Sequence, residues 1–206
     1  MDRPSRRAIP LWSRQVSRSR CTRLWEAWLF GEASDPDRIM GASDIEFLRS
    51  SDHGHYISGP SGIGKSHIIQ ALGQRVCVQG YRVLYRTSAE LLADLTASLA
   101  DKTLPARLRY YTRPDWLIID EFGFDRIERI ECAQAAHLLY KIIASRNQKR
   151  STALVTNVDF DKWGEYLVDG PLAMALLDRL VERAIILKIK GKTYRTPLVK
   201  GEDDPA

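Results

Sequence analysis

The sequence contains no apolar run that approaches the roughly 20 residues of a bilayer-spanning helix, so its pattern excludes a membrane-spanning protein. Cysteine is scarce: the three residues Cys21, Cys77 and Cys132 lie far apart, and no two of them form a CxxC pair. This spacing offers neither a disulfide framework nor a zinc site, and no histidine stands at zinc-ligand spacing from a cysteine. We therefore expect a cytoplasmic protein with no membrane partner.

Acidic side chains are nearly absent from the first 23 residues, which hold one aspartate and seven arginines. No apolar run follows these charges, as it would in a secretory signal. We interpret residues 1–34 as a basic, flexible arm, although a mitochondrial transit peptide has a similar composition. Residues 24–30 fit either an amphipathic helical turn or a docking patch. The formal net charge of the whole chain is +5, which fits a polyanionic partner and a solvated surface equally well.

Residues 35–200 alternate between short apolar segments and amphipathic segments, and a polar tail follows at 201–206. Helices are expected first at Asp35-Pro36 and at the capping box Ser43–Glu46. The later strands are expected at 55–59, 81–87, 115–122, 151–157 and 185–191. The later helices are expected at 66–80, 87–101, 104–111, 131–148, 160–167 and 172–184. Thr87 and Glu90 form a capping box at the start of the second of these helices. This alternation predicts an α/β domain whose parallel sheet is covered on both faces.

The segment Gly59–Ser66 matches GxxxxGK[ST] at every fixed position, between an expected strand and an expected helix. Its glycines allow successive backbone N–H groups to point at phosphate oxygens, and the helix N-terminus adds partial positive charge. Lys65 is expected to reach the β- and γ-phosphates of a nucleotide, and the Ser66 hydroxyl to bind Mg²⁺. The alternative, a plain glycine-rich turn, leaves the complete match unexplained.

Two adjacent carboxylates, Asp120 and Glu121, end the apolar run at 116–119. In a phosphate-loop protein we expect Asp120 to hold the hydration shell of Mg²⁺ and Glu121 to polarise the attacking water. This pair favours hydrolysis over phosphoryl transfer to a small acceptor. An acidic strand end that only faces solvent is the alternative.

The next expected strand ends in Thr156 and Asn157, a pair that is common in turns. As the third polar group in this order along the chain, Asn157 is expected to contact the γ-phosphate or the water.

Arg179 and Arg183 are four residues apart in an expected helix, so they would share one face. A salt-bridged surface is one interpretation. The other is an arginine finger that stabilises transition-state charge in the site of a neighbouring subunit, which requires an oligomer.

Taken together, these residues resemble the IstB-type helper ATPases of bacterial insertion sequences, which are relatives of the DnaC-type replicative helicase loaders. The resemblance covers about residues 45–195. It rests on the motifs GPSGIGKSH, GYRVLYRTSAELL, LIIDEFG, KRSTALVTN, WGEYL, ALLDRL and IKGKTYR. It implies a P-loop NTPase of the AAA+ type, with a five-stranded parallel sheet between helices. It also implies the absence of a separate lid domain, since only about fifteen residues follow the last expected strand.

The resemblance implies ATP and Mg²⁺ as cofactors of a bacterial cytoplasmic ATPase. The residues it places at the nucleotide are Gly59, Pro60, Ser61, Gly62, Ile63, Gly64, Lys65, Ser66 and His67. The metal is assigned to Ser66 and Asp120, and the catalytic roles to Glu121, Asn157 as sensor 1, and Arg179 as the finger. Arg179 matches the finger position better than Arg183 does.

The implied partners are double-stranded target DNA, a transposase and further copies of the chain joined through the arginine finger. A basic cluster at the expected helix 104–111 is assigned to DNA; it consists of Lys102, Arg107, Arg109 and Arg113. Such cations suit phosphates and imply little sequence preference, and a solvated helix face is the alternative.

The expected function is a DNA-stimulated ATPase that assists transposition. A DnaC-like helicase loader is the runner-up, and a non-hydrolysing scaffold that binds DNA with ATP stays open. A small-molecule P-loop kinase is disfavoured, because such kinases carry an arginine-rich lid and lack this order of Asp-Glu and Thr-Asn strand ends. The arginine-rich start departs from the helical region that usually precedes the ATPase core in this family, and EFG replaces the usual ELG.

Overall fold

The computed structural model describes residues 54–123, 133–167, 169–190 and 193. The expected basic arm, the helices near residues 35 and 43 and the polar tail lie outside these residues. None of the helices in the described part of the chain has the length and hydropathy needed to cross a membrane.

Five strands form one sheet, in which every neighbouring pair is parallel. They are β1 (His55–Ser58), β2 (Val83–Thr87), β3 (Trp116–Phe122), β4 (Ser151–Thr156) and β5 (Ile185–Lys188). The spatial order is β2-β3-β4-β1-β5, so β4 lies between the strand that precedes the phosphate loop and the strand that carries the acidic pair. The predicted five-stranded parallel sheet is confirmed, and the carboxyl ends of all five strands meet at one edge.

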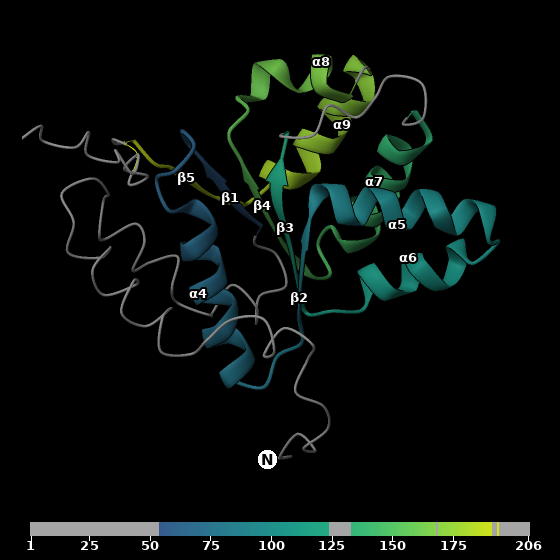
Figure 1. Cartoon of the computed structure of the whole chain (residues 1–206), viewed down its shortest axis with the longest axis horizontal. Helices are drawn as coiled ribbons and strands as arrows, with labels where there is room; N and C mark the ends of the chain where they lie inside the picture. Colours follow the sequence, from purple (N-terminus) through teal and green to yellow (C-terminus); the bar gives the residue numbers. More distant parts are fainter. Residues whose placement is uncertain (1–53, 124–132, 168, 191–192, 194–206) are drawn as a thin grey trace, which may run out of the picture.

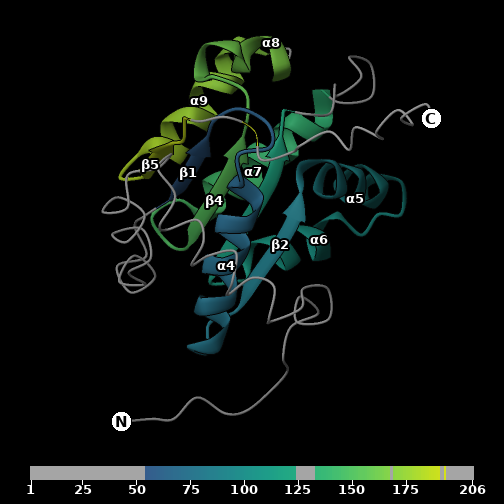
Figure 2. The same ribbon diagram turned by 60° about the vertical axis from the view of Figure 1, so that its left-hand side comes forward.

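Helices cover both faces of this sheet, as Figures 1 and 2 show. The described helices are α4 (Lys65–Val78), α5 (Ser88–Ala100), α6 (Leu104–Thr112), α7 (Ala133–Arg146), α8 (Trp163–Leu167) and α9 (Gly170–Val181). In the views, α4 lies on one face and α5, α7 and α9 on the other. The single helix expected at 160–167 is instead a 3-10 turn, Phe160–Lys162, followed by the short α8.

Side chains of β3 alternate between the two faces, as a strand buried on both sides requires. Trp116 and Ile118 pack in the apolar cluster that includes α4, whereas Leu117 and Ile119 pack in the cluster of α5, α7 and α9. All four are fully buried, which contributes roughly 1.5–3 kcal/mol for an aliphatic side chain of this size. Phe122 breaks the alternation, because it also packs in the second cluster.

The N-terminus of α5 has the capping box that its sequence predicts. The Thr87 hydroxyl accepts a hydrogen bond from the backbone N–H of Glu90 at 3.2 Å. In return, the Glu90 carboxylate accepts from the Thr87 N–H at 3.1 Å. These two bonds fix the point at which β2 leaves the sheet and α5 begins.

The end of α9 differs from the expectation that Arg179 and Arg183 share a helix face. The helix ends at Val181, and Arg183 has a left-handed backbone with φ of 55°. The intervening Glu182 carboxylate accepts hydrogen bonds from Asn147 and Gln148 in the turn before β4. Arg183 therefore lies beyond the helix, and the expectation that it shares a helix face with Arg179 was wrong.

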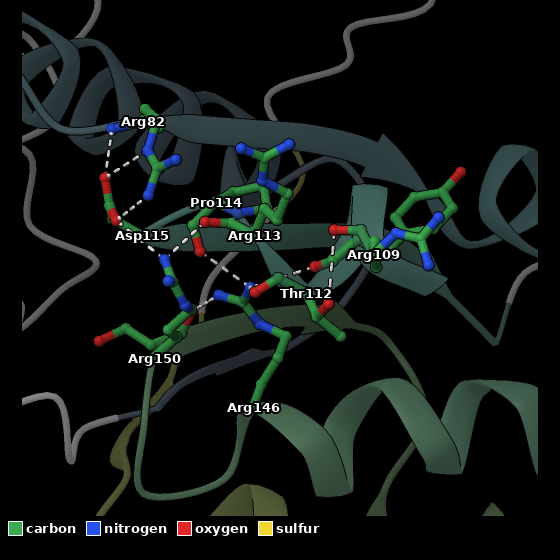
Figure 3. A network of polar contacts seen from close by, with 10 residues as sticks. Arg82, Arg109, Thr112, Arg113, Pro114, Asp115, Arg146 and Arg150 are labelled. Atoms are coloured by element: carbon green, nitrogen blue, oxygen red, sulfur yellow. Dashed lines mark hydrogen bonds and ion pairs between the residues drawn. The ribbon is translucent and has the colours of Figure 1, made fainter. Parts of the chain in front are cut away.

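A buried arginine joins α7, β4 and the segment before β3 at the amino edge of the sheet (Figure 3). Arg146 is 1% exposed. It donates to the Thr152 hydroxyl and to the carbonyl oxygens of Tyr111, Thr112, Pro114 and Ser151. Burial lowers the pKa of its guanidinium to about 9, which leaves it charged at neutral pH. Its charge is thus met by oxygen atoms of two separate segments, residues 111–114 before β3 and residues 151–152 of β4.

Candidate nucleotide-binding site

The phosphate loop leaves β1 at the carboxyl edge of the sheet and turns directly into α4. Gly62 and Gly64 have φ of 80° and 91°, conformations that other residues rarely adopt. Gly59 is required for a second reason, since a Cβ atom there would lie 2.3 Å from the carbonyl oxygen of Ile189 after β5. The first N–H groups of an α-helix have no partner within the helix, so this 14-residue helix presents donors and partial positive charge to an anion.

Lys65 is the first residue of α4 and is 7% exposed. Its ammonium group donates to the carbonyl oxygens of Gly59 and Pro60, both at 2.7 Å. The side chain therefore folds back over the loop instead of extending into solvent. The Lys65 ammonium therefore lies beside both the loop and the N-terminus of α4. Positive charge and backbone N–H donors at one place are what phosphate oxygens bind.

Asp120 points to the α4 face of the sheet and is 1% exposed. One carboxylate oxygen accepts from the Tyr85 hydroxyl at 2.6 Å, and the other accepts from the Glu121 N–H at 2.8 Å. The Tyr85 hydroxyl in turn accepts from the Gln70 amide at 3.0 Å. Burial and the neighbouring Asp120 charge raise the pKa of Tyr85 well above its usual value, so Tyr85 is a hydrogen-bond donor at any physiological pH.

Glu121 is set apart from Asp120 by a bulge in β3. Ile119 pairs with Leu154 and Phe122 with Thr156, so β3 has one more residue than β4 over this interval. Asp120 keeps its place opposite Thr87 in β2, which identifies Glu121 as the extra residue.

Glu121 has φ of 58°, in the left-handed region that costs a non-glycine residue about 1–2 kcal/mol, and its side chain is exposed. The bulge explains why Phe122 packs on the same face as Ile119, since one inserted residue reverses the side of every later residue. Adjacent carboxylates are thereby given different environments, one buried and one open.

The ends of β3 and β4 are tied together by Thr156, which is fully buried. Its hydroxyl donates to the Phe122 carbonyl oxygen at 2.6 Å and accepts from the Val158 N–H at 2.9 Å. A Cβ atom on Gly123 would lie 2.3 Å from the Val158 side chain, so the two turns pack closely. Asn157 follows at the strand end and is exposed at the same edge as the phosphate loop.

Arg179 lies away from this edge. It is in the last turn of α9, which leads into the amino end of β5, whereas the phosphate loop follows the carboxyl end of β1. Its guanidinium donates to the Ala175 carbonyl oxygen and lies 4.9 Å from the centroid of the Tyr140 ring on α7. Arg179 is therefore not brought to the phosphate loop of its own chain.

The four residues of the predicted DNA-binding cluster are all exposed on or beside α6. Lys102 precedes the helix, Arg107 and Arg109 lie on it, and Arg113 follows it. Arg107 also forms an ion pair with Asp94 of α5, with N···O of 3.4 Å, and this pair offsets part of its charge. Figure 3 shows Arg109 and Arg113 near the segment that leads into β3.

A family model described as "IstB-like ATP binding protein" matches residues 20–199. The chain belongs to the IstB-like ATP-binding family. It is 36% identical over 166 residues to a protein of Pseudomonas aeruginosa named as the ATP-binding protein of insertion sequence IS21. It is 33% identical over 161 residues to the corresponding protein of insertion sequence IS5376 from Geobacillus stearothermophilus. These alignments cover 81% and 78% of the chain but 61% and 62% of the relatives, so the chain spans little more than three fifths of their length.

Solved structures confirm the AAA+ P-loop fold for this IstB-like chain. The structure of the replication initiator DnaA bound to AMPPCP and single-stranded DNA aligns with a TM-score of 0.61 and 21% sequence identity. The alignment covers 81% of this chain and 49% of the DnaA chain. The structure of the DnaC helicase loader aligns with a TM-score of 0.60 and 17% sequence identity. The alignment covers 81% of this chain and 99% of the DnaC chain.

The side chains at the carboxyl edge of the sheet have the chemical groups needed to bind Mg²⁺ and a nucleoside triphosphate. Mg²⁺ prefers oxygen ligands, often one or two carboxylates together with phosphates. In this IstB-like site the Ser66 hydroxyl is in the first turn of α4, and the Asp120 carboxylate faces the same helix. Each carboxylate oxygen of Asp120 accepts one protein hydrogen bond, which leaves a lone-pair site on each oxygen for the water ligands of a metal.

Three contributors to the site are given no such role by the sequence motifs. Tyr85 donates to Asp120, and Gln70 donates to Tyr85, only because the sheet order places β2 beside β3 and α4 packs over both. The bulge at Glu121 is the third. Apolar residues at 119 and 122 fit a regular strand that is buried on both faces, so the sequence carries no signal for this bulge.

Proposed function

We propose that this chain binds Mg–ATP between the phosphate loop and the ends of β3 and β4, hydrolyses it, and assists transposition by assembling on duplex target DNA with a transposase. The observation that carries the catalytic part is the bulge that separates Asp120 from Glu121. A buried carboxylate suits a metal site, and an exposed carboxylate at the same edge suits a water molecule. Membership of a family whose relatives are named for insertion sequences supports the biological part.

Each residue then has a distinct task in hydrolysis. The phosphate loop and the first turn of α4 bind the phosphates, and Lys65 exchanges its loop carbonyl partners for β- and γ-phosphate oxygens. Glu121 orients the attacking water and accepts its proton, and Asn157 is the sensor that contacts the γ-phosphate. When bound through Ser66 and Asp120, Mg²⁺ would supply positive charge at the β- and γ-phosphates.

We assign Arg179 to the active site of a neighbouring copy of the chain. Its place near the amino edge of the sheet supports a role in trans, because the phosphate loop of its own chain is at the opposite edge. In a head-to-tail assembly the amino side of one copy meets the carboxyl side of the next. Arg179 would then leave Tyr140 and contact the γ-phosphate held by its neighbour.

Mixing variants tests this assignment. Arg179→Ala and Lys65→Ala are each expected to lack ATP hydrolysis. A working site needs an intact Lys65 in one copy and an intact Arg179 in the next. Random head-to-tail assembly of an equimolar mixture brings these together at about a quarter of the sites, so the mixture should regain up to about a quarter of wild-type activity. A mixture of Lys65→Ala with Glu121→Gln is the control, since both changes damage the same half. Wild-type turnover by Arg179→Ala alone, or a mixture as inactive as the control, would contradict the assignment.

We assign DNA contacts to the exposed basic residues on and beside α6. Replacing Arg107, Arg109 and Arg113 with alanine together should weaken ATP-dependent binding to duplex DNA of any sequence. The slope of log K against log[salt] should fall by about 2–3, since each lost phosphate contact removes about 0.9 from the slope. Fluorescence anisotropy with a labelled duplex at several salt concentrations measures both quantities.

A matched variant removes three charges from exposed positions elsewhere: Arg75 on α4, Lys141 on α7 and Lys162 in the 3-10 turn. It should retain the wild-type slope. If the two triple variants lose DNA binding equally, the loss is caused by the lower net charge of the chain, and the assignment of DNA contacts to α6 fails.

A second candidate function, loading of a replicative helicase, is favoured by the match to almost the whole DnaC helicase loader chain. The chemistry of the ATP site would be the same, and the partner would differ. Affinity purification of the tagged chain with either the transposase or the replicative helicase separates the two functions.

A further inference from the structure

A continuous set of hydrogen bonds connects the helix that follows the phosphate loop to the buried aspartate. Gln70 donates from α4 to the hydroxyl of Tyr85 on β2 at 3.0 Å, and Tyr85 donates to Asp120 on β3 at 2.6 Å. None of the motifs that identify the site contains Gln70 or assigns a role to Tyr85. The three residues come from three different elements, so the contact exists only in the folded chain.

The position of each residue explains why the contact forms. Gln70 is four residues after Ser66, and residues four apart lie on the same face of a helix. Tyr85 is two residues before Thr87, which pairs with Asp120, so its side chain is on the α4 face and diagonal to the carboxylate. A tyrosine is long enough to reach from that diagonal position to Asp120, whereas a serine or threonine is not.

The direction of the hydrogen bonds is fixed by the donors available. A tyrosyl hydroxyl has one proton, and Tyr85 receives the Gln70 amide N–H on its oxygen, so its own proton is directed to Asp120. The Glu121 N–H holds the other carboxylate oxygen. With one donor on each oxygen, the plane of the carboxylate is set by β2 and by the bulge of β3 together.

We propose that Tyr85, supported by Gln70, is a positioning residue that holds the Asp120 carboxylate in the orientation that receives the water ligands of Mg²⁺. This inference rests on the proposed function, because it assigns to Tyr85 a part in binding the metal of that site. Partners that orient a metal-binding group typically change metal affinity by 10–100-fold when they are removed.

Binding of a non-hydrolysable ATP analogue during a magnesium chloride titration tests the proposal without requiring turnover. For Tyr85→Phe, the Mg²⁺ concentration at half-maximal binding should rise about tenfold, while affinity for the analogue in EDTA should change less than twofold. Gln70→Leu should shift the midpoint in the same direction by a smaller factor, because Tyr85 keeps its proton but loses its support. Gln70→Leu also provides a second test of the positioning role of Tyr85 if Tyr85→Phe does not fold.

The matched control is Tyr111→Phe. Tyr111 also donates its hydroxyl to a carboxylate, that of Asp94 at 2.8 Å, but does so between α6 and α5. Its Mg²⁺ midpoint should equal that of the wild type. An unchanged midpoint in a folded Tyr85→Phe, or equal shifts in Tyr85→Phe and Tyr111→Phe, overturns the positioning role while leaving ATP binding intact. If the wild type itself binds no analogue with or without Mg²⁺, both the proposed function and this inference fall.

Discussion

Lys65→Ala is expected to abolish ATP hydrolysis and to weaken nucleotide binding by at least tenfold. The Lys65 ammonium is almost fully buried and is held by two loop carbonyl oxygens, so it is already positioned where phosphate oxygens would bind. A hydrogen bond to a charged group contributes about 1.5–3 kcal/mol, and about 1.4 kcal/mol corresponds to a factor of ten in affinity. Equilibrium binding of a fluorescent ATP analogue and initial rates of phosphate release measure the two effects.

An exposed lysine supplies the control for this experiment. Lys141 on α7 lies on the outer surface, and Lys141→Ala should bind and hydrolyse ATP as the wild type does. Wild-type affinity and turnover in Lys65→Ala would place the nucleotide somewhere other than the phosphate loop.

Arg146→Leu is expected to lower the free energy of unfolding by about 3–5 kcal/mol, the range for breaking a buried, charged network by removal of one partner. Leucine fills part of the space but leaves five oxygen acceptors, from residues 111–114 and from the start of β4, without their donor. Unsatisfied buried carbonyl groups are costly, since no water replaces the lost bond. Urea denaturation with linear extrapolation gives the free energy directly.

Arg150 provides the comparison for Arg146, because it is close in the chain and contacts the same segment (Figure 3). Its side chain is 36% exposed and forms an ion pair with Asp115 at 3.1 Å. Arg150→Leu should cost less than about 1 kcal/mol, as is usual for exposed ion pairs. If Arg146→Leu is no less stable than Arg150→Leu, the buried network does not hold α7 to the sheet.

The sequence predicts the parts of this fold that depend on local pattern. The phosphate loop, the apolar strand before Asp120 and the capping box of α5 each specify their own conformation within a few residues. The parallel sheet follows, because strands that alternate with helices and are apolar throughout must be covered on both faces. The family resemblance adds the AAA+ type, which the comparisons confirm.

What the sequence does not predict depends on contacts between distant segments. Glu121 looks like the next residue of a strand, and only the pairing of β3 with both β2 and β4 reveals that it is bulged out. Arg146 near a helix end looks like a solvated residue that favours the helix dipole, yet it is buried by the segment before β3. Arg183 looks helical by spacing, but Glu182 is held by the turn before β4.

ATP hydrolysis on DNA is tested directly by the rate of phosphate release by the full chain, with and without duplex DNA. Lys65→Ala is measured beside it at the same low salt concentration. We expect turnover that rises with duplex DNA and is absent from Lys65→Ala under both conditions. That result would support active sites completed between copies assembled on DNA. Turnover that duplex DNA leaves unchanged would contradict the DNA-assembled ATPase. Turnover no higher than that of Lys65→Ala would contradict hydrolysis itself.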